Sequence, residues 1–326
     1  MRKLGGIILL LAASSRGFAQ PTPAPVPAPV PAPAPVPATG ADQDSLIKVD
    51  VDVVNVLCTV YDQRGALVQN LQKEDFQVLE NGKKQDIRYF ARDTDLPLTV
   101  ALLVDVSGSV RRFIEEEKDA AAKFLETVLR PADHAMVVGF SSTMVLWQDF
   151  TSSPELLRGA VERLRPVPFR GLPAAQQPMP ATLLYDAVTQ AARQKLQDVS
   201  GRKAMVIISD GLDNGSQTHL EDAIKAVQST NTIVYGICYE SGYSGCSFLK
   251  SISEQTGGST FQAGKKVPLS KIFDTIQEEL RSQYSLGYVP ANRARDGAFR
   301  KLQVRMRGKG LRVQARKGYY AVKEKR

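Results

Sequence analysis

The chain has 326 residues, of which 43% are hydrophobic and 23% are charged. These proportions are typical of a globular protein with one large domain or two smaller ones, and they argue against wholesale disorder, a collagen-like fibre and a bundle of membrane spans. With only two histidines and three cysteines, the composition also argues against a zinc site and a histidine-based catalytic triad. We therefore expect any bound metal ion to have oxygen ligands.

The net charge of +8 is unevenly distributed along the chain. Residues 293–326 carry a net charge of +11 and residues 1–19 carry +3, which leaves −6 for the rest. The net positive charge thus comes from one basic terminus, which includes a basic tail at residues 323–326, and not from a uniformly basic surface. We therefore expect no nucleic-acid partner.

The first residues have the pattern of an export signal. Arg2 and Lys3 precede an apolar run at residues 4–13, and Gly17-Phe18-Ala19 forms a small-x-small cleavage site. Such a run spans about 15 Å as a helix, roughly half of the hydrocarbon core, so an uncleaved membrane anchor is the weaker alternative. We predict a signal peptide over residues 1–19 and an exported chain (periplasmic, cell-surface or secreted) without a stable membrane span.

Residues 20–44 form a proline-rich linker. Every odd position from Pro21 to Pro37 is proline, which fixes φ at alternate residues and favours a polyproline II rod. We interpret this segment as a spacer. A ligand for a proline-recognition module is the alternative, although such modules act mostly inside eukaryotic cells.

Two β-rich segments flank the middle of the chain. In the segment 45–95, residues 47–61 alternate apolar and polar side chains, and Asn81-Gly82 between short strands at residues 75–80 and 86–90 is a strong hairpin signal. Strands return over residues 284–322, at residues 284–288, 302–306, 311–315 and 319–322. Each segment alone is too short for a stable core, so we expect the two to pack together as one β-sandwich.

Residues 96–283 alternate strands with helices. Apolar strands are predicted at residues 98–104, 135–140, 144–147, 204–208 and 232–238, and helices at residues 155–164, 183–196 and 272–280, with one more opened by a capping box, Thr218-His219-Leu220-Glu221. The predicted fold is α/β: a doubly wound parallel sheet flanked by helices and inserted in the β-sandwich. Ligands of such sheets bind at the carboxyl ends of the strands.

Oxygen-bearing side chains follow two of these strands. Asp105, Ser107 and Ser109 come directly after the first strand and can direct three oxygens at one point. Asp210 follows the strand at 204–208, and Thr182 lies at a predicted helix start. Such donors suit Mg²⁺. The alternative is that these side chains only cap helices.

These five residues, Asp-x-Ser-x-Ser with a downstream Thr and Asp, resemble the metal-ion-dependent adhesion site (MIDAS) of the von Willebrand factor type A (VWA) domain. The segments around them, and 316–320, resemble bacterial exported VWFA-related proteins, so that the resemblance covers residues 45–322 and implies a VWA domain over 96–283. In this family the Ser and Thr hydroxyls bind the metal directly, while the carboxylates act directly or through water. The resemblance implies Mg²⁺, with Mn²⁺ or Ca²⁺ as alternatives, and a protein partner that completes the metal shell with Asp or Glu.

One departure from the family concerns the Thr loop, where relatives often have glycines and this chain has Met179-Pro180-Ala181. A stiffer loop is the expected consequence, which argues against a large rearrangement when a ligand binds.

We predict no enzymatic activity. A haloacid-dehalogenase-type site would need an acidic residue where Ser107 stands, and the chain has neither a complete P-loop nor a Gly-x-Ser-x-Gly elbow. The sequence instead favours an exported, divalent-metal-dependent protein-binding or adhesion module. The alternative is a structural, matrix-binding or carbohydrate-binding protein that uses a basic β face, on which we expect Arg305, Arg307, Arg312 and Arg316 to lie together; a plain solvated face is the simpler interpretation.

The three cysteines divide into a pair and a single residue. Cys238 ends a predicted strand and Cys246 begins the next helix, so an exported protein could join them in a disulfide, the alternative being two independent thiols. Cys58 lies in a predicted strand and is expected to be a buried, unpaired thiol.

Overall fold

A computed structural model describes residues 53–92, 96–108, 111–165, 181–239 and 246–321, without the side chains of residues 111–117. The chain divides into two units, Met1–Val49 and Asp50–Arg326, and all of the described residues belong to the second. The predicted signal peptide, the linker and the basic tail at 323–326 lie outside the described residues. The proposed domain boundaries thus remain predictions.

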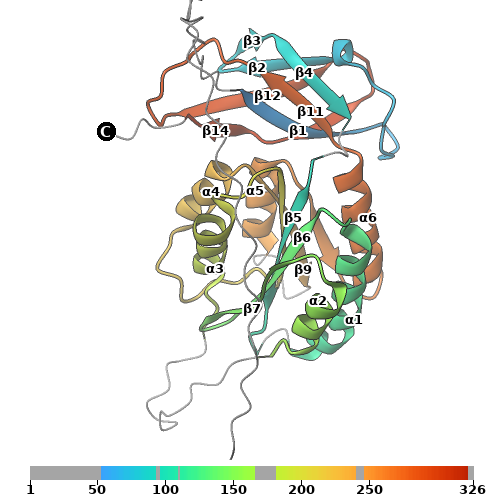
Figure 1. The fold of residues 1–326 in the computed structure, drawn as a ribbon, viewed down its shortest axis with the longest axis vertical. Helices are drawn as coiled ribbons and strands as arrows, with labels where there is room; N and C mark the ends of the chain where they lie inside the picture. Colours follow the sequence, from blue (N-terminus) through green and yellow to red (C-terminus); the bar gives the residue numbers. More distant parts are fainter. Residues whose placement is uncertain (1–52, 93–95, 109–110, 166–180, 240–245, 322–326) are drawn as a thin grey trace, which may run out of the picture. The chain divides into compact units, whose positions relative to one another are not determined.

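The α/β part is built on a six-stranded sheet with the order β10-β9-β8-β5-β6-β7 (Figure 1). Five strands are parallel: β5 (Leu98–Asp105), β6 (His134–Phe140), β8 (Arg202–Ser209), β9 (Thr232–Tyr239) and β10 (Thr260–Ala263). Nearly every residue of β5, β8 and β9 is buried, as the continuous apolar runs predict for strands covered on both faces. The predicted α/β fold class is confirmed.

Two strands differ from the prediction. β7 (Met144–Thr151) pairs antiparallel with β6, because only the short turn at Ser141–Thr143 joins them and a parallel connection needs a crossover. β10 was not predicted at all, since its sequence, Thr-Phe-Gln-Ala, is short and mixed in polarity. The sheet is therefore mixed, with an antiparallel strand at one edge.

Helices cover both faces of this sheet (Figure 1). One apolar core lies under α1 (Arg111–Val128), α2 (Pro154–Glu162) and α6 (Leu269–Arg281). The other lies under α3 (Leu184–Gln190), a π-helical segment (Ala191–Leu196), α4 (Leu220–Ser229) and α5 (Cys246–Thr256). Within the described residues, no helix is both long and apolar enough to span a membrane.

The predicted capping box at residues 218–221 is wrong. α4 begins at Leu220 after His219, and no side chain caps it there. The backbone N–H groups of Gln217 and Thr218 instead donate to the carboxylate of Asp186, at 3.1 and 2.9 Å. A tertiary contact with α3 has replaced the expected local one.

The flanking strands form two antiparallel sheets, β13-β1-β11-β4 and β14-β12-β2-β3. N-terminal strands supply β1 (Val54–Tyr61), β2 (Phe76–Glu80), β3 (Lys83–Gln85) and β4 (Ile87–Arg92), with a short 3₁₀ helix at Lys73–Asp75. C-terminal strands supply β11 (Tyr284–Tyr288), β12 (Phe299–Met306), β13 (Arg312–Ala315) and β14 (Gly318–Tyr320). Both sheets mix strands from the two ends of the chain around one apolar core, which confirms the inserted arrangement.

The dipeptide Asn81-Gly82 forms the turn between β2 and β3, with positive φ angles of 48° and 79°. Positive φ at both positions is what a tight hairpin of this type requires. The strand expected as the hairpin partner, β4, instead joins the other sheet and pairs with β11.

The expected single arginine face does not exist, because β12 and β13 belong to different sheets. Arg305 on β12 and Arg307 just after it are exposed. On β13, in contrast, Arg312 lies 4.3 Å from the ring of Tyr61, and Arg316 hydrogen-bonds Asn231 at the start of β9. The arginines of the C-terminal strands thus belong to two different sheets, and Arg316 is the one that hydrogen-bonds the α/β part.

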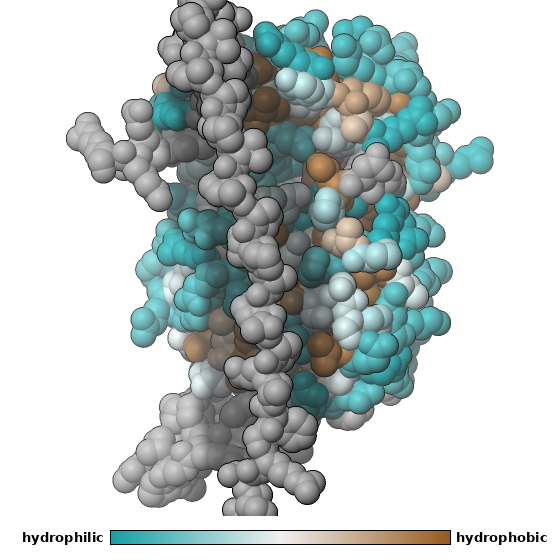
Figure 2. Space-filling view, in the orientation of Figure 1, coloured by the Kyte–Doolittle hydropathy of each residue, from teal (hydrophilic) through white to brown (hydrophobic). Residues whose placement is uncertain are grey.

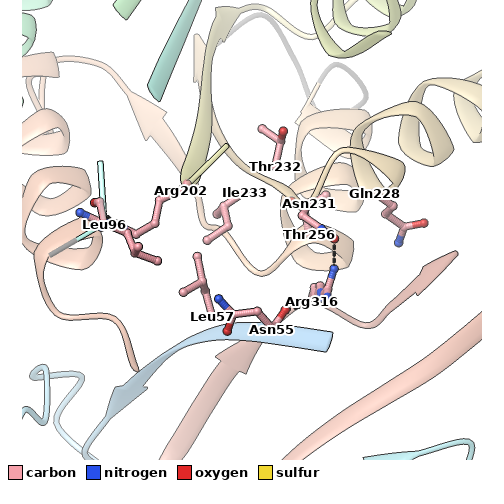
Figure 3. A pocket seen from close by; sticks show the side chains of 11 residues that line it. Asn55, Leu57, Leu96, Arg202, Gln228, Asn231, Thr232, Ile233, Thr256 and Arg316 are labelled. Carbon is pink, nitrogen blue, oxygen red and sulfur yellow. Dashed lines mark hydrogen bonds between the residues drawn. The ribbon is translucent and has the colours of Figure 1, made fainter. Parts of the chain in front are cut away.

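A cavity of about 130 Å³ lies at this junction, at the amino ends of β8 and β9 (Figure 3). Asn55 and Leu57 of β1 face Arg202, Thr232 and Ile233 across it. The guanidinium of Arg202 donates to the carbonyl oxygens of Leu96 and Leu280, at 3.2 and 2.8 Å. These bonds tie the start of β8 to α6 and to the segment before β5, while Leu57 of the sandwich packs against the apolar core of the α/β part. The junction lies opposite the edge where a ligand is expected.

Figure 2 shows the surface of one side of the molecule, where small hydrophobic areas are separated by hydrophilic residues. The large exposed apolar side chains, such as Tyr89 and Leu156, are distributed over different elements. Single exposed apolar residues of this kind are ordinary on protein surfaces.

A buried carboxylate completes the junction. Glu279, in the last turn of α6, is 3% exposed and accepts hydrogen bonds from the hydroxyl of Ser259 at 2.9 and 3.0 Å. Gln314 of β13 donates to the same hydroxyl at 2.9 Å. Burial raises the pKa of Glu279, and the hydroxyl hydrogen bonds only partly oppose this effect.

We expect Glu279 to make the protein less stable as the pH rises. Its pKa is higher in the folded than in the unfolded chain, so its stabilising effect is complete below pH 4.5 and is lost as the pH rises through the folded-state value. Glu279→Gln should flatten this dependence, which can reach about 1.4 kcal/mol per pH unit, in urea unfolding of the metal-free protein between pH 4.5 and 7.

The neighbouring Glu278 is exposed, and Glu278→Gln is the matched control that should keep the slope of the parent protein. Burial also raises the pKa of Asp105, so stability should still depend on pH in the Glu279→Gln variant. The slope of each variant is therefore compared with the slope of the parent protein. Equal slopes for Glu279→Gln and the parent would contradict the prediction.

Candidate functional site

Two carboxylates lie at the carboxyl ends of adjacent parallel strands. Asp105 is the last residue of β5, and Asp210 directly follows β8. The register of the two strands pairs Val104 with Ile208, which brings both carboxylates to one edge of the sheet. They are 1% and 2% exposed. This is the edge at which the sequence places the ligand site.

A serine that was not predicted holds Asp105 in place. One oxygen of Asp105 accepts the N–H of Ser107 at 2.8 Å, and the other accepts the hydroxyl of Ser209 at 2.7 Å. The same Ser209 hydroxyl accepts the N–H of Gly211 at 3.0 Å. Burial raises the pKa of Asp105, with the nearby Asp210 adding to the rise and the hydrogen bonds opposing it.

The loop after Asp210 ties Thr182 to the same edge. Asn214 accepts the N–H of Thr182 at 2.6 Å, and its own N–H donates to the Thr182 carbonyl at 3.3 Å. On the other side, the N–H of Leu183 donates to the carbonyl of Ser141, just after β6. Thr182 is therefore held between the ends of β6 and β8, and its side chain is largely buried.

The same loop caps α3. The N–H of Tyr185 donates to Asp213 at 2.9 Å, and the N–H of Asp186 donates to the hydroxyl of Ser216 at 3.0 Å. The helix begins at Leu184, and no side-chain cap comes from the residue before it. Thr182 thus lies next to the start of this helix, as expected. The side chains that cap the helix come from the loop after Asp210, which weighs against the alternative that Thr182 is only a helix cap.

The family of this domain follows from the comparisons with known proteins. Residues 100–213 match the family model for the von Willebrand factor type A domain. The chain contains a VWA domain. No curated protein matches the chain.

Solved structures with a similar fold include the mussel byssus proximal thread matrix protein 1 with a zinc-occupied MIDAS motif (16% identity, covering 63% of this chain and 50% of that one, TM-score 0.49). Another is a VWA protein from Catenulispora acidiphila (12% identity, covering 85% of this chain and 76% of that one, TM-score 0.48). A third is BatB from Bacteroides thetaiotaomicron (15% identity, covering 56% of this chain and 97% of that one, TM-score 0.44). This chain spans about half the length of the mussel protein.

The structure places four of the five predicted site residues of the VWA domain at one edge of the sheet: Asp105, Ser107, Thr182 and Asp210. Ser109 lies outside the described residues, as does Met179-Pro180 before the Thr loop. Sequence reasoning missed Ser209, Asp213 and Asn214, which position the others. A polar residue at the end of an otherwise apolar strand was the available signal for Ser209.

The donors at this edge fit an oxygen-coordinated cation. Within the described ranges, no three His, Cys, Asp or Glu side chains lie close enough to form a metal site. The edge instead offers two buried carboxylates together with Ser and Thr hydroxyls. Hard divalent cations prefer such oxygen donors, and a cation there would offset the repulsion between the buried carboxylates.

The cysteines of the structure agree with the sequence pattern. Cys238 in β9 and Cys246 at the start of α5 form a disulfide with a Cα–Cα distance of 5.8 Å. Cys58 is a buried free thiol in β1, as predicted, and burial raises its thiol pKa.

Proposed function

We propose that the VWA domain is a divalent-metal-dependent protein-binding or adhesion module. The observation that carries this proposal is the pair of buried carboxylates, Asp105 and Asp210, at the ends of adjacent strands, with Thr182 tied to the same edge through Asn214. A purely structural role gives no evident reason to place two buried carboxylates together, because burial and the neighbouring Asp210 both raise the cost of ionising Asp105.

In this proposal, Ser107, Ser109 and Thr182 bind the metal through their hydroxyls, and Asp105 and Asp210 hold water ligands and orient the hydroxyls. Mg²⁺ is the expected ion, with Mn²⁺ and Ca²⁺ as alternatives. When bound, the ion supplies an electrophilic centre that favours a carboxylate, so the partner is a protein that presents Asp or Glu.

The proposed setting is outside the cytoplasm, in the periplasm, on the cell surface or in the medium. The Cys238–Cys246 disulfide supports it, because disulfides persist in oxidising compartments. The predicted signal peptide and the spacer fit the same setting. Under this proposal the chain is a binding module and not an enzyme, and neither nucleic acid nor a membrane is its partner.

The test is a calorimetric titration of Mg²⁺ and of Mn²⁺ into the EDTA-stripped protein, with Ser107→Ala and Asp210→Ala as variants. We expect the parent chain to bind and both variants to lose binding while remaining folded. Excess acetate should strengthen binding by supplying the partner carboxylate. A folded parent chain that binds neither ion, with or without acetate, would overturn the proposal.

The alternative function, binding of matrix or carbohydrate through a basic β face, has less support. This alternative assumed that Arg305, Arg307, Arg312 and Arg316 lie together on one face. In the structure they belong to two different sheets. Arg316 hydrogen-bonds Asn231 at the junction with the VWA domain, and the exposed Arg312 packs over the ring of Tyr61 in its own sheet.

A further inference from the structure

The Cys238–Cys246 disulfide lies directly behind the candidate metal site. β9 is the neighbour of β8, and their register pairs Cys238 with Ser209. The sulfur of Cys238 lies 3.9 Å from the carbonyl oxygen of Asp210. One sulfur atom therefore contacts the backbone of the turn Ser209–Gly211, which presents Asp210 and holds Asp105 through the Ser209 hydroxyl.

The other half of the disulfide is anchored in the core. Cys246 is the first residue of α5, and this helix buries Phe248, Leu249 and Ile252 against the sheet. The bond thus fastens the end of β9 to a fixed helix. The sequence separation of the two cysteines is only 8, and a loop this short constrains the unfolded chain less than a long one does. The effect of the bond should therefore be mainly local.

The disulfide can be reached from outside. Both cysteines line a groove of about 610 Å³ together with Lys250 and Glu254 of α5 and Gln262 of β10. Cys238 is fully buried whereas Cys246 is partly exposed, so a small dithiol that enters the groove attacks the Cys246 sulfur. Cys58, in contrast, is buried in the sandwich and remains protonated, because burial raises its pKa.

We propose that the Cys238–Cys246 disulfide positions the Ser209–Gly211 turn and thereby sets the divalent-cation affinity of the site, so that reduction weakens cation binding. This inference rests on the proposed function. In the reduction, one thiolate of a dithiol attacks a disulfide sulfur, and its second thiol resolves the mixed disulfide. Two electrons and two protons pass to the cysteines, and the dithiol leaves as its own cyclic disulfide.

The test compares Mn²⁺ binding before and after reduction. The oxidised and the dithiothreitol-reduced protein, the latter freed of reagent without oxygen, are titrated with Mn²⁺ by calorimetry in a Cys58→Ala background. Cys246→Ser breaks the bond without a reductant and leaves the Cys238 sulfur in place. We expect the reduced protein and Cys246→Ser to bind about tenfold more weakly, as is typical when groups that orient metal ligands are lost. Cys58→Ala alone should bind as the parent chain does.

Hydrogen exchange without metal tests the positioning step by itself. The amides of Gly211 and Leu212 should exchange faster in the reduced protein, while those of β5 keep their protection. Unchanged exchange at Gly211 and Leu212, or equal Mn²⁺ affinity in both redox states, overturns this inference alone. Failure of the folded, oxidised protein to bind any divalent ion, with or without acetate, overturns the proposed function, and with it any redox control of affinity.

Discussion

Replacing Gly258 with alanine is expected to destabilise the protein by about 3–5 kcal/mol, the range of severe steric changes in a core. Gly258 links α5 to β10, and a Cβ atom there would overlap the carbonyl oxygen of Val234 and lie 2.8 Å from its carbonyl carbon. Both are backbone atoms of β9, which pairs with β8 on one side and β10 on the other, so neither can move without disturbing the sheet. Urea unfolding of the parent chain and the variant measures the effect.

Gly308 supplies the matched control for this substitution. A Cβ atom at Gly308 would lie 3.4 Å from the side chain of Leu311, which is an ordinary contact. Gly308→Ala should therefore change the free energy of unfolding by less than about 0.5 kcal/mol. A similar small effect for Gly258→Ala would show that the α5–β10 connection is not as tightly packed against β9 as the structure has it.

Local patterns predicted the elements that are long and uniformly apolar. β5, β8 and β9 are buried on both faces, so their residues could be recognised as strands without knowledge of their neighbours. β10 could not, because its four residues form a strand only through pairing with β9. The antiparallel direction of β7 follows from its short connection to β6. The pattern of apolar residues does not indicate the direction of a strand.

The arginines show a second limit of sequence patterns. Alternation correctly placed Arg312 and Arg316 on the side of β13 that faces away from the sandwich core, since Val313 and Ala315 pack into that core. It could not tell that Arg316 on this side hydrogen-bonds Asn231 of the VWA domain while Arg312 stays exposed. A period of two identifies the two faces of a strand, but the partner of each face depends on the whole fold.

At the candidate site, the sequence pointed to the residues proposed as metal ligands and missed those that position them. Asp105 and Asp210 were found because each carboxylate directly follows an apolar strand run, where ligands of such sheets bind. Asn214 acts through a bond to the backbone of Thr182, far away in the sequence, and only the folded loop brings the two together. Positioning residues of this kind have no signature of their own in a single sequence.

Removing the Ser209 hydroxyl should weaken both the fold and the site. Ser209→Ala deprives the buried Asp105 carboxylate of a hydrogen bond and leaves the Gly211 N–H without its acceptor. Buried polar groups that lose a partner cost about 1–3 kcal/mol each, so we expect a loss of about 2–4 kcal/mol in urea unfolding. Under the proposed function, Mn²⁺ affinity in the folded variant should also fall by about tenfold or more.

Ser229→Ala is the control for the loss of a serine hydroxyl in the VWA domain. Its hydroxyl donates to the carbonyl of Ala226 within α4, away from the strand edge, so its removal should change stability little and leave Mn²⁺ binding intact. If Ser209→Ala unfolds at the same urea concentration as Ser229→Ala, the Ser209 hydroxyl does not hold Asp105. If only its Mn²⁺ affinity is unchanged, Asp105 reaches its binding position without this serine, and the metal shell is organised from the Thr182 side, through Asn214.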